Sequence, residues 1–189
     1  RPRDLRRRLG VHQGVRTGIH ERAVRTTSTP LHRQSAHLVH GRDGFCLRTT
    51  TTRAALTDLE SDPLQRFLEA GVQYVLFAHT HPGYYAVMSS PELADTRPYP
   101  ELHKAAAEST SILMSAIQDS MAAGLIKGAD PRDVAAAAWA SVHGLASLIR
   151  GGQLRNLGFD LDGSAEEIED VARRITRTLL LNVAAQVPS

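Results

Sequence analysis

Apolar residues recur at three- and four-residue steps through most of the chain, which is the spacing of one helix face. After Asp62 and Pro63, this pattern is carried by Leu64, Phe67, Leu68, Val72, Val75 and Leu76. An aspartate followed by proline is a favoured helix start, because the carboxylate caps free N–H groups and proline needs no donor there. We therefore expect a helix from residue 63 to 79–81, since Pro82 disfavours helical geometry in the residue before it.

Similar start and stop signals predict four further helices. They are a short helix at 82–88, a long helix at about 99–123, and helices at 131–150 and 165–185. Gly124 is the expected end of the second, and Asp130 begins the third. Ser164 and Glu167 fit a capping box before the last. No window alternates at period two, so the sequence predicts an all-α bundle without strands.

The start of the chain differs from the rest in composition. Residues 1–53 hold 12 arginines and three acidic residues, a net charge of +9, whereas residues 54–189 carry a net charge of −7. Helical periodicity is absent from residues 1–43, and few of their side chains are apolar. We therefore expect an atypical basic segment at 1–43, disordered or loosely attached, and an α-helical domain at 44–189.

Composition also excludes several classes of protein. The single cysteine, Cys46, excludes an internal disulfide framework and a cysteine-rich zinc site. The longest mostly apolar run, 134–149, has 16 residues and contains His143, so it is too short and too polar to span a bilayer. The arginine-rich start lacks the apolar stretch of a secretory signal. These features predict a cytoplasmic protein without a membrane partner.

No pattern of residues supports catalysis. A glycine-rich phosphate loop, a nucleophile elbow and a His-Glu-x-x-His motif are all absent from the sequence. His79 and His81 are two residues apart and would point to different sides of a helix, so we interpret them as a polar helix end. We expect no metal, no cofactor and no enzymatic activity; a helical enzyme that uses His143 has no supporting motif.

The most informative stretch is the helix at 131–150. Trp139 lies four residues before His143, so both side chains are on one helix face. Gly144 in a helix interior costs about 1 kcal/mol relative to alanine. Such a glycine typically permits the close approach of a ligand or another helix. The alternative is a tryptophan that fills the core beside a hydrogen-bonded histidine.

Trp139, His143 and Gly144 resemble the Trp-His-Gly signature of a C-terminal domain in tetracycline-repressor-like (TetR-type) transcriptional regulators. Further motifs resemble the same family in the same order within residues 44–187. They are the helix segment 67–78, the His-Pro break and aromatic turn at 81–88, Gly124-Leu-Ile, and Asp130-Pro-Arg-Asp.

The resemblance implies a homodimer in which the helices at about 131–150 and 165–186 pack against their copies. The expected interface residues are Ala138, Val142, Leu145, Ile168, Ile175 and Leu179. It also implies a small apolar or amphipathic effector in a pocket enclosed by the preceding helices. The expected lining is Tyr74, Phe77, Tyr85, Met88, Met114, Ile117, Trp139 and His143. Aromatic and methionine side chains offer adaptable apolar contact, although each could equally belong to an ordinary core.

The sequence departs from the family at its front. Family members begin with a helix-turn-helix that binds operator DNA, and residues 1–43 hold no such pattern. One hypothesis is an out-of-frame translation of that domain, because GC-rich coding sequence read in a wrong frame yields Arg, Thr, His and Ser. The sequence thus predicts a ligand-responsive TetR-type regulator whose DNA-binding domain cannot be recognised in the sequence. The alternative is a dimeric helical small-molecule-binding module without DNA-binding activity.

Overall fold

The computed structural model describes residues 30–59 and 61–185. Six α-helices account for most of this part: α1 Pro30–Leu56, α2 Pro63–Thr80, α3 Pro82–Met88, α4 Pro100–Ala122, α5 Pro131–Arg150 and α6 Ala165–Ala185. Three short 3₁₀ helices connect them: η1 Thr57–Leu59, η2 Pro91–Leu93 and η3 Gln153–Leu157. The described residues contain no strand, which confirms the all-α class, and the helix bounds after residue 62 agree with the predicted ones.

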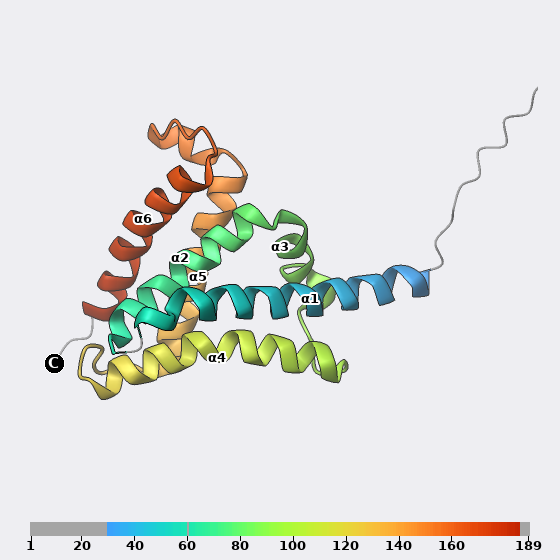
Figure 1. Ribbon diagram of the computed structural model, residues 1–189, viewed down its shortest axis with the longest axis horizontal. Coiled ribbons are helices and arrows are strands. Elements are labelled where there is room, and N and C mark those ends of the chain that lie inside the picture. The colour runs from blue at the N-terminus through green and yellow to red at the C-terminus, as the bar shows by residue number, and fades with distance from the viewer. Residues whose placement is uncertain (1–29, 60, 186–189) are drawn as a thin grey trace, which may run out of the picture.

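The helix α2 lies at the centre of the bundle. The helices α1 and α4 lie side by side, and α2 packs against both of them and against α5 and α6 (Figure 1). The first turns of α1 extend beyond the other helices. Two clusters of buried side chains form the core; one includes Val75, Phe77 and Tyr85, and the other includes Phe67 and Ile117.

The predicted capping residues act as expected at three helix starts. Asp62 accepts a hydrogen bond from the Gln65 backbone N–H at 3.0 Å, and Asp130 accepts one from Arg132 at 2.8 Å. Ser164 Oγ accepts from the Glu167 backbone N–H at 3.3 Å. The Glu167 carboxylate reaches further back than a capping box requires, since it accepts from the backbone N–H groups of residues 162 and 163.

The helix α1 crosses the predicted boundary at residue 43, so the prediction that residues 30–43 lack helical structure is wrong. A buried face does follow helical spacing along α1, but before Leu56 it consists of glycine and threonine: Gly41, Gly44, Thr49 and Thr52. Hydrophobic periodicity misses such a face because glycine and threonine carry little hydrophobic signal. The expectations for residues 1–29 lie outside the described residues.

Gly71 permits a close crossing of α2 with α5 and α6. A Cβ atom at this position would lie 2.8 Å from Thr176 Cγ2 on α6 and 3.2 Å from Val142 Cγ1 on α5. The close approach expected at Gly144 is therefore found at Gly71 instead. A Cβ at Gly144 would meet no described atom within 4 Å, so the space beside it is open within one chain.

Four of the six residues expected at a dimer interface face the core of their own chain. Ala138, Val142, Leu145 and Ile168 are 1–5% exposed because α2 and the neighbouring helices cover them. These side chains cannot contact a partner subunit in this structure, so their assignment to the dimer interface is wrong. Ile175 and Leu179, on α6, are half-buried.

We predict that Gly71→Ala destabilises the fold, because the added methyl group would overlap side chains of α5 and α6. Overpacking of this kind costs about 1–3 kcal/mol. The matched control is Gly83→Ala on α3, where a Cβ would meet nothing within 4 Å. Urea unfolding followed by circular dichroism compares the two variants. Equal stability of Gly71→Ala and the wild type would show that the helix crossing accommodates the added methyl group without strain.

Candidate functional site

A hydrogen-bonded cluster of aromatic side chains joins α2, α3 and α5. The hydroxyls of Tyr74 and Tyr85 each lie 2.9 Å from His143 Nδ1. The indole N–H of Trp139 donates to the Tyr74 hydroxyl at 3.2 Å. Four of the eight predicted pocket residues therefore come together. With the hydrogen on Nε2, His143 Nδ1 has a single lone pair, so the two phenols share one acceptor.

Burial raises the pKa of the Tyr74 phenol to about 12. The low-dielectric surroundings disfavour the phenolate, and this effect outweighs the hydrogen bond from Trp139. Tyr74 therefore keeps its proton over the physiological range and remains a hydrogen-bond donor.

Arg48, which the sequence analysis missed, extends the cluster to α1 and α4. Its Nε–H donates to Ser109 Oγ at 2.8 Å, and its guanidinium carbon lies 5.3 Å from the centre of the Tyr74 ring. Phe45 lies at a similar distance, 5.4 Å. Burial lowers the pKa of Arg48, and no carboxylate of the described residues forms an ion pair with it. The sequence analysis considered the arginines of residues 1–53 only for their net charge and therefore did not single out Arg48.

The other predicted pocket residues are distributed through the core. Phe77 and Ile117 are 4% and 0% exposed and belong to different core clusters, as the core alternative anticipated. Met88 packs against α1 at Gly44, and Met114 is half-buried on α4. Trp139 is 58% exposed, so the alternative of a tryptophan that fills the core is wrong.

His79 and His81 occupy a polar helix end, as predicted. His79 Nε2 lies 3.1 Å from the Gly163 carbonyl oxygen, and the His81 ring stacks on Phe77. Within residues 30–59 and 61–185, no three His, Cys, Asp or Glu side chains come close enough to hold a metal ion. None of the helices described combines the length and apolar composition needed to cross a membrane.

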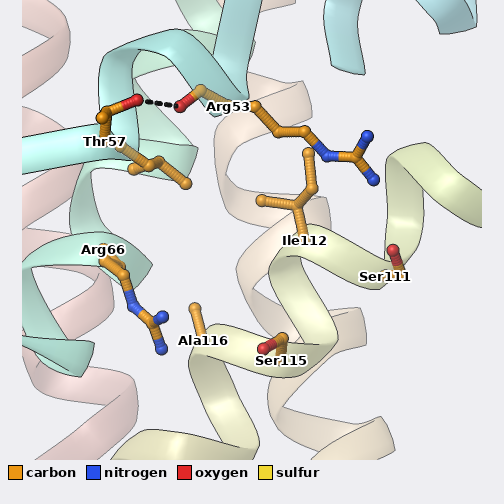
Figure 2. A pocket seen from close by; sticks show the side chains of 8 residues that line it. Arg53, Thr57, Arg66, Ser111, Ile112, Ser115 and Ala116 are labelled. Carbon is orange, nitrogen blue, oxygen red and sulfur yellow. Dashed lines mark hydrogen bonds between the residues drawn. The ribbon is translucent and has the colours of Figure 1, made fainter. Parts of the chain in front are cut away.

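A pocket of about 450 Å³ lies between the C-terminal end of α1, the start of α2, and α4 (Figure 2). Its lining residues are Arg53, Leu56, Thr57, Arg66, Ser111, Ile112, Ser115 and Ala116. None of the eight predicted residues is among them, although Met114 and Ile117 are on the same helix. The sequence signal was weak because arginine, serine and threonine on a helix usually indicate a solvated face.

The two arginines of this pocket differ in their partners. Arg66 forms an ion pair with Asp119, which also accepts from Ser115 Oγ at 3.2 Å. No carboxylate of the described residues pairs with Arg53, whose side chain extends past Ser111 and Ile112 in Figure 2. One unpaired cation, several hydroxyls and apolar walls suit a ligand with an acidic group and an apolar body.

A family model described as "Tetracyclin repressor-like, C-terminal domain" matches residues 67–172, more than half of the chain. The chain belongs to this family. The match includes α3, α4, α5 and most of α2 and extends into α6, so it covers the tyrosine–histidine cluster of Tyr74, Tyr85, Trp139 and His143 and the α4 wall of the pocket. The tetracyclin repressor-like domain thus accounts for most of the described bundle.

The domain is also similar to a solved structure. It matches a protein of unknown function from Rhodococcus sp. RHA1, with a TM-score of 0.60 and 26% sequence identity. The match covers 78% of this chain and 73% of the other. No curated protein matches the chain.

We predict that burial delays the ionisation of the Tyr74 phenol to high pH. Ultraviolet titration should show a phenol with a pKa of about 12, and Tyr74→Phe should remove that step. The native state holds this proton more tightly than the unfolded chain, so its stability falls as the pH rises from 10 to about 12. Loss of a lower-pH step in Tyr74→Phe instead would mean that the phenol is not buried in solution.

Proposed function

We propose that the chain is the effector-sensing and dimerising part of a TetR-type transcriptional regulator, in which a small amphipathic effector controls DNA binding. Membership of the tetracyclin repressor-like family supports this role. The observation that carries the proposal is the pocket in Figure 2, because its walls include α1, the helix that leads back to the basic N-terminal segment. The Trp-His-Gly subtype stays a prediction.

The chemistry of the pocket refines the expected effector. Its volume of about 450 Å³ suits a small organic molecule. An acidic group would pair with Arg53, while an apolar body would contact Leu56, Ile112 and Ala116. The hydroxyls of Ser111 and Thr57 would orient polar substituents. We therefore propose an amphipathic organic acid rather than a purely apolar effector.

The contacts of α1 suggest how binding would be transmitted. Arg53 and Leu56 line the pocket, and Arg48, on the same helix, bonds to Ser109 on α4. An effector between α1 and α4 would favour one spacing of these two helices over another. Because α1 is continuous, this preference would reach Pro30 and alter the affinity of the N-terminal region for DNA.

We propose that dimerisation uses the outer face of α5 rather than the buried residues expected from sequence. This face carries Ala137, Ala140, Gly144 and Leu148; the alanines are exposed, and Leu148 is 40% exposed. Small side chains would let a second copy approach closely. Ile175 and Leu179, half-buried on α6, could extend the same contact.

The second candidate is a dimeric small-molecule-binding module that does not bind DNA. The absence of helix-turn-helix signals from residues 1–43 favours it. A mobility-shift assay with the DNA upstream of the chain's own gene separates the two. A shift that an effector reverses supports the regulator, and the lack of any shift supports the binding module.

For the effector site, we predict that anilinonaphthalenesulfonate, an acidic amphipathic dye, binds in the pocket of Figure 2. Arg53→Gln should weaken its binding about tenfold, since a charge-assisted hydrogen bond contributes about 1.5–3 kcal/mol. Arg97→Gln is the control, because Arg97 is exposed and paired with Asp95. Dye fluorescence measures the affinities. An unchanged affinity in Arg53→Gln would contradict this assignment.

For the dimer, we predict that Gly144→Gln shifts the chain from dimer to monomer without unfolding it. The space beside Gly144 is open within one chain, so the longer side chain obstructs only a partner. Gly83→Gln is the matched control, because its surroundings are equally open and it lies on α3. Analytical ultracentrifugation measures the masses. A Gly144→Gln dimer as tight as the wild type would place the interface elsewhere.

A further inference from the structure

A second pocket, of about 400 Å³, lies where the end of α2, the end of α5, η3 and the loop before α6 meet. It shares no lining residue with the pocket of Figure 2, which lies between α1, α2 and α4. Its lining residues are His79, Pro82, Ile149, Arg150, Gly152, Leu154, Arg155, Phe159, Leu161, Gly163 and Ile168. The family match spans all of these residues, but the proposed effector site includes none of them.

Apolar side chains form the floor of the second pocket. Leu154 and Ile168 are 4% and 1% exposed, and Ile149, Phe159 and Leu161 are half-buried around them. An alkyl chain laid on this floor would be removed from water, which is the main source of affinity for apolar ligands. The partial exposure of three of these side chains shows that the protein itself leaves part of the floor uncovered.

Cationic side chains border this floor. Arg150 and Arg155 are both exposed lining residues, and no carboxylate of the described chain forms an ion pair with either. The guanidinium carbon of Arg150 lies 4.9 Å from the centre of the Tyr85 ring. Two unpaired guanidinium groups beside an apolar floor are complementary to a ligand with one anionic end.

The acidic residues of the adjoining loop do not neutralise these arginines. The Glu167 carboxylate accepts hydrogen bonds from the backbone N–H groups of Asp162 and Gly163. The Asp162 carboxylate accepts one from the Ser164 backbone N–H at 2.7 Å, and this bond lowers the pKa of Asp162. Both carboxylates thus maintain the loop, and the lining of the pocket contains no acidic residue.

We propose that this pocket binds a medium-chain aliphatic carboxylate, with the carboxylate between Arg150 and Arg155 and the alkyl chain on the apolar floor. The occupied pocket adjoins the tyrosine–histidine cluster, because the ring over which Arg150 lies belongs to Tyr85, whose hydroxyl contacts His143. A carboxylate that pairs with Arg150 would therefore change the surroundings of this cluster. The second pocket lies at the end of α2, whereas the Figure 2 pocket lies at its start.

Isothermal titration calorimetry with decanoate, below its micellar concentration, tests the proposal. We expect one decanoate per chain, and at least tenfold weaker binding by Arg150→Gln/Arg155→Gln. Arg97→Gln/Arg132→Gln is the matched control, because it removes the same charge from two exposed arginines paired with Asp95 and Asp130. This control should bind like the wild type, and circular dichroism verifies that both double variants fold.

Two further ligands and one variant separate the competing outcomes. Acetate should not bind, because it lacks an alkyl chain, and decanol should bind at least tenfold more weakly than decanoate. Arg53→Gln should leave decanoate binding unchanged; weakening in this variant alone would assign decanoate to the Figure 2 pocket. The proposal is overturned by that result, by equal losses in the two double variants, by decanol binding as tightly as decanoate, or by no measurable decanoate binding.

Discussion

The arrangement of the domain depends on the crossing of three helices at Gly71. Because this residue has no side chain, Val142 of α5 and Thr176 of α6 can both pack directly against the α2 backbone. The crossing also sets the relative position of α2 and α5 at the tyrosine–histidine cluster. With Val142 held at Gly71, the next residue of α5, His143, reaches Tyr74 on the following turn of α2. The relative position of Tyr74 and His143 therefore depends on the absence of a side chain at Gly71.

Polar contacts around the tyrosine–histidine cluster link α1, α2, α3, α4 and α5, in addition to the contacts of the core. Arg48 contacts Tyr74 from α1 and Ser109 on α4, while Tyr85 brings α3 to His143. A guanidinium without a carboxylate is costly to bury, and its contacts with aromatic faces and one hydroxyl offset only part of that cost. Burial of Arg48 therefore stabilises the fold less than burial of an apolar core side chain does.

The sequence predicted the helices after residue 62 because their caps and glycine stops are local signals. It missed the start of α1 because the buried positions there, Gly41 and Gly44, carry no side chain, and the next ones, Thr49 and Thr52, are polar. It assigned Ala138 and Ile168 to a dimer interface because an apolar pattern shows that a helix face is buried but not whether its own chain or a partner subunit buries it. Half of the candidate site was found through Trp139 and His143, whereas the pockets depend on tertiary contacts among residues that look solvated.

Because α1 is long, a small tilt of this helix at the Figure 2 pocket would displace its N-terminal end by a larger distance. The helix has 27 residues, and the part between Arg53 and Pro30 measures about 35 Å at 1.5 Å per residue. A rigid rod of that length tilted by about 5° moves its far end by about 3 Å. Gly41, Gly44, Thr49 and Thr52 are buried against the bundle, whereas the first turns of α1 extend beyond the other helices. A tilt of the whole helix would therefore also displace its contacts at Gly41 and Gly44, where the side chains of Leu93 and Met88 lie against the helix.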